Sequence, residues 1–179
     1  MNRAVFLDRD GVLNEDLIGY PHKIEHLKPV RNAAEAMKLL GSMGFLKIMV
    51  TNQAGVGEGY FKEKDFYAFN DALLEKVGKV DDVFACFHSR DDGCKCRKPS
   101  GKMLEDAAKK HKLDLRKSYM VGDQDRDIKM GRSVGCITIF VKSGAYGTSE
   151  SKGNNADYIA SDLLDAARWI AENENKKSE

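Results

Sequence analysis

The 179-residue sequence lacks a charge imbalance, a long apolar run and an internal repeat. Lysine and arginine total 29 against 28 aspartate and glutamate residues, so the net charge of +1 gives no long-range attraction to nucleic acid or anionic membranes. No stretch approaches the roughly 20 apolar residues that cross a bilayer, and the first residues do not resemble a signal peptide. These absences predict a cytoplasmic protein whose partners include neither nucleic acid nor a membrane.

Aromatic residues and cysteines are also few. Aromatic side chains make up 8% of the sequence, which argues against a surface that stacks single-stranded bases. Three of the four cysteines, Cys86, Cys94 and Cys96, form a cluster, while Cys136 lies alone in an apolar run. In a cytosolic chain such a cluster favours metal binding over a disulfide, and Cys136 is expected to be a small core residue.

Short apolar runs alternate with helical patterns along the chain. Most runs are continuous, as in parallel strands that are covered on both faces. Strand followed by helix, repeated, predicts an α/β fold: a three-layer, doubly wound parallel sheet with right-handed crossovers and no separate cap domain. The expected strands are 4–7, 45–50, 83–88, 119–121, 136–141 and 158–159, and the expected helices are 32–43, 62–77, 101–111, 125–134 and 161–170.

The end of the chain is strongly polar. Ser161 is the predicted N-cap of the last helix. A single domain is expected over residues 1–171, followed by a polar tail, 172–179, that frays. Residues 143–155 are rich in glycine, serine and asparagine and are expected to form a mobile loop.

Chemically active side chains follow four of the expected strands. Ligands of parallel α/β sheets bind at the carboxyl ends of the strands, so these side chains are expected to form one site. They are Asp8 and Asp10 after the first strand, Thr51 and Asn52 after the second, Cys86 and His88 with Arg97 and Lys98 beyond the third, and Asp123 after the fourth.

The two acids after the first strand require a cation. Residues two apart on a strand point the same way, so Asp8 and Asp10 share a side while Arg9 points to the opposite one. Two close carboxylates repel each other unless a positive charge is near, and Mg²⁺ suits such oxygen ligands. The alternative is a turn with solvated acids; a calcium loop would need further acidic ligands that "DRDGVLNED" lacks.

Two further segments indicate a phosphate. In "TNQAGVGEGYF" the Thr51 hydroxyl and the Asn52 amide precede three glycines whose backbone N–H groups could face a phosphate; the alternative is a flexible turn. In "CRKPSGKM" the basic pair Arg97 and Lys98 precedes a helix; the alternative is an exposed pair without function.

The cysteine cluster has the spacing of a metal site. Cys86, His88, Cys94 and Cys96 supply three thiolates and an imidazole, which complete tetrahedral Zn²⁺ with no open position and predict a structural, zinc-stabilised loop. Free thiols beside a surface histidine, or a regulatory Cys94–Cys96 disulfide, are the alternatives. Because Cys96 is bonded directly to Arg97, zinc at this position would fix the basic pair.

The motifs "FLDRDGVLN", "VTNQAGVG", "CRKP" and "VGDQDRD", in that order, resemble the four motifs of the haloacid dehalogenase (HAD) superfamily of phosphohydrolases. The resemblance implies Mg²⁺-dependent hydrolysis of a phosphomonoester through an aspartyl-phosphate. It assigns the nucleophile to Asp8, the general acid and base to Asp10, the Mg²⁺ ligands to the Asp8 and Asp123 side chains and the Asp10 carbonyl, and the phosphoryl contacts to Thr51, Asn52 and Lys98.

A zinc loop followed by Arg-Lys-Pro resembles the D-glycero-D-manno-heptose 1,7-bisphosphate 7-phosphatase family and its relative, histidinol-phosphate phosphatase. "NEDLIGYPHKIEHLKPV" and "TNQAGVGEGYF" are similar to the heptose enzymes, whereas the short loop between His88 and Cys94 resembles the histidinol-phosphate spacing, and "DLIGY" is one residue longer than the heptose version. The substrate contacts implied are Asp16, Gly19, Tyr20, Gln53, Ala54 and Arg97, of which Arg97 suits a second phosphate.

Two other classes share part of this pattern. A nucleic-acid 3′-phosphatase has similar "TNQ" and "RKP" motifs but needs a basic track. A non-enzymatic zinc module has no use for the unpaired acids. The favoured partner is a small phosphorylated metabolite, and the chain is expected to be a monomer.

Overall fold

The computed structural model describes residues 1–16, 19–144 and 155–176. Its centre is a six-stranded sheet in the order β3-β2-β1-β4-β5-β6, in which every neighbouring pair is parallel. This confirms the predicted fold class. The strands are β1 (Ala4–Leu7), β2 (Leu46–Asn52), β3 (Asp82–Cys86), β4 (Tyr119–Gly122), β5 (Ile137–Val141) and β6 (Tyr158–Ala160).

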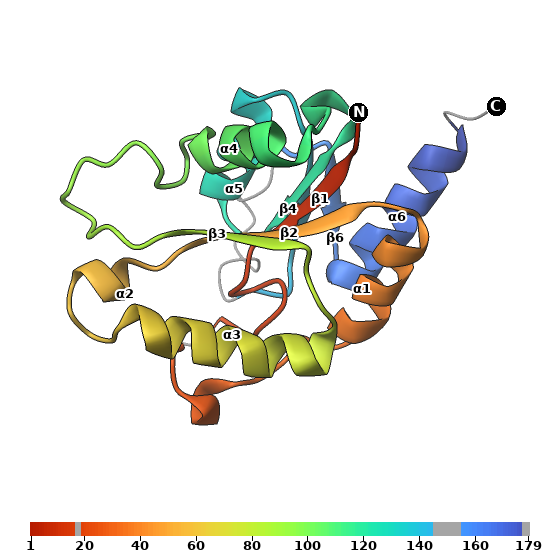
Figure 1. The fold of residues 1–179 in the computed structure, drawn as a ribbon. Helices are drawn as coiled ribbons and strands as arrows, with labels where there is room; N and C mark the ends of the chain where they lie inside the picture. The colour runs from red at the N-terminus through yellow and green to blue at the C-terminus, as the bar shows by residue number, and fades with distance from the viewer. Residues whose placement is uncertain (17–18, 145–154, 177–179) are drawn as a thin grey trace.

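Helices cover both faces of the sheet (Figure 1). Alternate residues of β1 serve the two cores: Val5 and Leu7 pack with α1, α3 and α6, whereas Ala4 and Phe6 pack with α4 and α5. The helices are α1 (Ala33–Ser42), α2 (Ala54–Gly57), α3 (Glu63–Val77), α4 (Lys102–His111), α5 (Asp125–Ser133) and α6 (Leu163–Lys176), with short 3₁₀ turns at Ile24–His26 and Leu115–Lys117.

The central strand lies where the winding direction reverses. β1 pairs with β2 on one side and with β4 on the other, so that Phe6 is level with Ile48 and with Met120. Segments that follow these three strands therefore meet at one edge of the sheet. In doubly wound sheets this crevice is where ligands bind.

The last helix is longer than the sequence predicts. α6 continues to Lys176, so the prediction of a frayed tail is wrong for residues 172–176. The extension has partners on the body of the domain: the Tyr119 hydroxyl donates to Glu174 Oε1 at 2.5 Å, and Glu174 also pairs with Arg3. Asn173 Nδ2 donates to the same hydroxyl at 2.9 Å.

The start of this helix also differs from the prediction. Asp162, not Ser161, is the capping side chain, because its Oδ1 accepts a hydrogen bond from Asp165 N at 2.9 Å. The Ser161 backbone instead donates to Asp165 Oδ2 at 2.8 Å. Most of the mobile loop predicted for 143–155 lies outside the described residues. Among the helices of the described residues, none has the length and apolar composition of a membrane span.

Candidate active site

Three buried carboxylates meet at the switch point of the sheet. Asp8 follows β1, Asp123 follows β4 and Asp127 lies in the first turn of α5, and each offers an oxygen within 4.8 Å of the others. The predicted convergence of Asp8 and Asp123 is therefore present. Their chain positions are far apart, and only the parallel pairing of β1 with β4 brings them together.

Lys98 lies against this acidic cluster. Its Nζ is 2.9 Å from Asp8 Oδ1 and 2.7 Å from Asp127 Oδ1, and its side chain is fully buried. Burial opposes the charged amine, but the two carboxylates outweigh burial and raise the pKa of Lys98 above its ordinary value. The backbone N–H of Lys98 donates to Asn52 Oδ1 at 3.1 Å, which ties the basic pair to the end of β2.

Asp123 needs a cation. Both of its carboxylate oxygens are buried and have no hydrogen-bond partner among the residues that the structure describes. Burial, together with the charges of Asp8 and Asp127, raises the pKa of Asp123 to about 9. Several oxygen ligands around an uncompensated buried carboxylate fit a hard divalent cation such as Mg²⁺.

Glycines make room for the Asp123 carboxylate. A Cβ atom built on Gly11 would lie 2.3 Å from Asp123 Oδ2, and one on Gly144 would lie 1.9 Å from the same oxygen. Gly11 also has a φ of 86°, which side chains rarely adopt. The motif "DRDG" therefore requires its glycine for two independent reasons.

We expect Gly11→Ala to abolish activity at this site and to lower the free energy of unfolding by about 1–3 kcal/mol, measured by urea denaturation. Gly59→Ala is the matched control, because Gly59 has a similar φ of 79° but nothing within 4 Å of its Cβ position. Equal activity in the two variants would show that contact with Asp123 does not matter.

Asp127 is a site residue to which the sequence analysis assigns no role. Its Oδ2 accepts a hydrogen bond from Gln124 N at 3.1 Å, the pattern of a helix capping box, while Oδ1 faces Lys98. Burial raises the pKa of Asp127 to about 6, although Lys98 opposes the shift. The Gln-x-x-Asp spacing at the start of a helix indicates a capping role for Asp127. That role accounts for its Oδ2 but not for the contact of Oδ1 with Lys98.

The side chain of Arg9 points in a direction that differs from the prediction. Alternation would put it opposite the acids, but β1 ends at Leu7 and the alternation ends with it. The guanidinium turns back to Asp10, with Nη2 2.8 Å from Oδ2. The side chain of Asp10 is thus paired with arginine rather than grouped with the other three carboxylates.

A cavity of about 330 Å³ opens beside these residues. Asn52 Nδ2, Arg97 Nη1 and Arg126 Nε are buried donors without a hydrogen-bond partner in the described part of the chain, so the cavity is prepared for an anion. Its lining includes the predicted Asp8, Asp10, Asp16, Gly19, Tyr20, Thr51, Asn52, Gln53, Ala54 and Arg97, and the unpredicted Pro21, Arg90, Gln124 and Arg126.

A polar contact joins three segments beside the cavity. The Tyr20 hydroxyl donates to Glu58 Oε2 at 2.6 Å and accepts from Arg90 Nη2 at 2.8 Å. These residues come from the predicted substrate loop, the end of α2 and the loop of the cysteine cluster. Asp16 also lines the cavity, and burial together with Asp10 and Asp8 raises the pKa of Asp16 to about 6.

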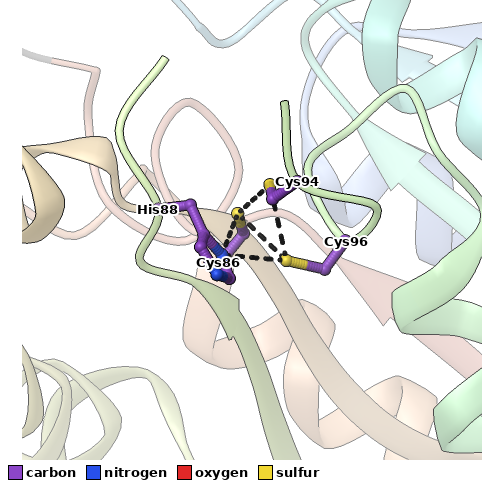
Figure 2. A group of neighbouring side chains, drawn as sticks. All are labelled: Cys86, His88, Cys94 and Cys96. Carbon is purple, nitrogen blue, oxygen red and sulfur yellow. Dashed lines mark hydrogen bonds between the residues drawn. The ribbon is translucent and has the colours of Figure 1, made fainter. Parts of the chain in front are cut away.

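The cysteine cluster forms at the end of β3 (Figure 2). The sulfur atoms of Cys86, Cys94 and Cys96 lie 3.3, 3.5 and 3.7 Å apart, and His88 Nδ1 lies 3.3 Å from Cys96 Sγ and 3.7 Å from Cys86 Sγ. A tetrahedral zinc ion with Zn–S bonds of about 2.3 Å places its sulfur ligands about 3.8 Å apart. The four side chains therefore fit zinc without rearrangement of the chain.

The buried Cys86 thiol is a poor candidate for an independent nucleophile. Burial, followed by the hydrogen bond with Cys96, raises the pKa of Cys86 to about 12. A metal ion reverses such a shift because it stabilises thiolates. Cys136 is buried in the core, as predicted, and lies outside the cluster.

Comparisons with known proteins agree with this geometry. A HAD-hydrolase-like family model matches residues 95–166. D-glycero-beta-D-manno-heptose-1,7-bisphosphate 7-phosphatase of Haemophilus influenzae is 36% identical over 181 residues, which cover 95% of this chain and 97% of the relative. D-glycero-alpha-D-manno-heptose-1,7-bisphosphate 7-phosphatase of Photorhabdus laumondii is 36% identical over 163 residues, which cover 85% of this chain and 88% of the relative.

Among solved structures, D,D-heptose 1,7-bisphosphate phosphatase from B. bronchiseptica, complexed with magnesium and phosphate, superposes with a TM-score of 0.87 at 29% identity and covers 96% of this chain and 99% of its own. Fold, acidic cluster and buried lysine together define a HAD-type hydrolase. More narrowly, the chain belongs to the D-glycero-D-manno-heptose 1,7-bisphosphate 7-phosphatase family. The resemblance drawn from the four motifs is thereby confirmed.

Proposed function

We propose that this protein removes the 7-phosphate of D-glycero-D-manno-heptose 1,7-bisphosphate by way of an aspartyl-phosphate. The observation that carries the chemistry is the contact of Lys98 Nζ with Asp8 Oδ1 at the edge of a cavity with unpaired cationic donors. The substrate is supported by relatives of both anomeric names that align with most of the chain.

In the first step, Asp8 attacks phosphorus in line with the ester oxygen of the leaving group. A P–O bond to the carboxylate forms as the P–O bond to the sugar breaks, and Asp10 donates a proton to the departing alkoxide. Lys98 offsets negative charge on the transferring group. The unpaired Asn52 Nδ2 and the Thr51 hydroxyl at the end of β2 are positioned to donate to phosphoryl oxygens.

In the second step, water displaces the Asp8 carboxylate from phosphorus. Asp10 is now a carboxylate and takes a proton from the water, whose oxygen forms a bond to phosphorus as the acyl-phosphate bond breaks. Inorganic phosphate leaves, and both acids return to their starting state. The two roles of Asp10 require that its carboxyl group reach the same side of the phosphoryl group in both steps.

Two metals complete the proposal. Asp8, Asp123 and the backbone carbonyl of Asp10 would hold Mg²⁺, which offsets the mutual repulsion of the acids and the charge of the phosphate. Asp127 faces Lys98 and would orient that lysine. Zn²⁺ in the cysteine cluster has a structural role and supports the segment that carries Arg97 and Lys98.

A bisphosphate explains the arginines that line the cavity. Arg97 Nη1 and Arg126 Nε are buried without a hydrogen-bond partner among the described residues. One guanidinium group can donate two parallel hydrogen bonds to two oxygens of the same phosphate. We assign both to the phosphate that is not cleaved. Arg126 extends the contact set predicted from the sequence.

We expect Arg97→Ala and Arg126→Ala each to raise KM for the heptose bisphosphate by about 10- to 100-fold, because each removes a charged hydrogen bond. The same variants should hydrolyse p-nitrophenyl phosphate, which has no second phosphate, nearly as well as the wild type. Arg132→Ala, on the outer part of α5 and away from the cavity, is the control. An equal loss on both substrates would contradict a role in binding the second phosphate.

The choice of substrate is tested by comparing kcat/KM for both anomers of the heptose bisphosphate, histidinol phosphate and simple sugar phosphates, with Mg²⁺ present. We expect one heptose anomer to give the highest value. A dominant value for histidinol phosphate would replace the substrate but retain the chemistry, whereas activity confined to nicked duplex DNA would replace the class of substrate.

A further inference from the structure

Arg9 is the largest fully buried side chain of the described residues, and it lies beside the site rather than in the apolar core. Its guanidinium stacks over Phe69 at 4.8 Å and Phe66 at 5.6 Å from the ring centroids. A buried guanidinium is costly to desolvate, and apolar side chains of similar volume often serve stability equally well. A purely structural role therefore explains its presence poorly.

The hydrogen bonds of Arg9 converge on the proposed acid–base residue. Nε is 3.1 Å from both Asp10 oxygens, and Nη2 is 2.8 Å from Asp10 Oδ2. Nη2 also donates to the Pro21 carbonyl at 2.8 Å and to Gln53 Oε1 at 3.2 Å, and Nη1 donates to Asn70 Oδ1 at 3.3 Å. One side chain thus joins Asp10 to the substrate loop, to the segment after β2 and to α3.

The two oxygens of Asp10 are not equivalent in this network. Oδ2 accepts from Arg9 Nη2, Arg9 Nε and Gln53 Nε2, the last at 3.2 Å, so its lone pairs are fully used. Oδ1 accepts only from Arg9 Nε, among the described residues. The side chain of Asp10 is 20% exposed and lines the cavity.

We infer that Arg9 is a positioning residue that fixes the carboxyl group of Asp10 so that Oδ1 exchanges the proton with the leaving group and then with water. The inference rests on the proposed role of Asp10. Arg9 is fully buried and does not line the cavity: it holds Oδ2 of Asp10 and thereby sets the direction of Oδ1. Gln53 shares this function, because it bridges Asp10 Oδ2 and the Thr51 hydroxyl, the latter at 2.9 Å.

The leaving group provides a readout that a merely structural role would not change. A phenolate needs a proton more than a p-nitrophenolate does, so a misplaced acid slows phenyl phosphate more than p-nitrophenyl phosphate. We compare kcat/KM for the two substrates, because this ratio reports the steps up to formation of the aspartyl-phosphate. Neither assay requires that the natural substrate be known.

We expect Arg9→Lys and Arg9→Gln to lower kcat/KM for phenyl phosphate by about ten-fold more than for p-nitrophenyl phosphate, and Asp10→Asn to show a larger difference of the same sign. Arg9→Lys should keep more activity than Arg9→Gln, because lysine retains the charge but loses the forked geometry. Ser118→Ala, a buried hydroxyl at the start of β4 and away from the cavity, should affect both substrates equally.

Asn70→Leu covers the case in which the Arg9 variants do not fold. Asn70 contacts Arg9, and its own Nδ2 has no partner among the described residues. Because Asn70 does not line the cavity, replacing its amide leaves the residues that line the cavity unchanged. A difference of a few-fold between the two substrates is expected. Equal losses on both substrates in the Arg9 and Asn70 variants, alongside a clear difference in Asp10→Asn, would overturn the positioning role alone. No difference in Asp10→Asn would overturn the proposed role of Asp10 as well.

Discussion

Asp8→Asn should lower kcat by about four orders of magnitude or more, because an amide cannot form the aspartyl-phosphate and the residual rate comes from binding alone. The fold should survive. The negative charge of Asp8 helps raise the pKa of Asp123, so its removal lessens repulsion among the buried acids, while Lys98 keeps its ion pair with Asp127. We therefore expect the melting temperature without Mg²⁺ to stay the same or rise, measured beside phosphate release.

The control for this experiment is Asp114→Asn. Asp114 caps the short turn at Leu115–Lys117, outside the cavity, and asparagine caps equally well. Wild type quenched in acid during turnover should carry covalent phosphate that hydroxylamine releases, and Asp8→Asn should carry none. Turnover by Asp8→Asn within about ten-fold of wild type would exclude Asp8 as the nucleophile.

Loss of the proposed zinc ion is the second change with a large expected effect. Removing the ion with a zinc-selective chelator, or replacing Cys96 by serine, should lower kcat by about 10- to 100-fold even after Mg²⁺ is restored. Cys96 is bonded to Arg97, and the next residue, Lys98, must hold Nζ within hydrogen-bond distance of Asp8 and Asp127. A loop that no longer binds the metal ion cannot hold the Lys98 amine in place as tightly.

Assays must be run below the melting temperature of the zinc-free protein, so that unfolding does not account for the loss. Cys136→Ala is the matched control, since Cys136 is a buried thiol outside the cluster. Metal analysis should give one zinc per chain for wild type and Cys136→Ala and none for Cys96→Ser. A folded, zinc-free protein with full turnover would refute a supporting role for the cluster.

The order of strands and helices could be predicted because buried parallel strands leave continuous apolar runs. Sequence patterns do not predict helix α2 (Ala54–Gly57), because its glycines favour a phosphate-binding loop. Packing excludes side chains at both of its glycines: a Cβ on Gly55 would lie 2.9 Å from Tyr20 Cγ, and one on Gly57 would lie 2.5 Å from Ser89 N. Such contacts depend on distant segments that local sequence patterns do not encode.

The meeting of Asp8, Asp123 and Lys98 followed from a rule about strand ends. The roles of Arg9 and Asp127 did not, because they depend on where side chains turn after regular structure has ended or begun. The contact of Tyr20 with Arg90 depends likewise on loops that have no periodicity. Sequence patterns therefore predict the residues that line the cavity more readily than the residues that orient them.

The central position of β1 in the sheet affects how the chain folds during synthesis. This strand precedes the other five strands of the sheet in sequence, yet one of its two neighbours, β4 (Tyr119–Gly122), follows only after β2 and β3. Pairings so distant in sequence form slowly, because a long stretch of chain must be ordered at once. The edge of β1 that pairs with β4 thus stays open until the chain up to β4 has left the ribosome, and nascent chains with unpaired strand edges are prone to self-association.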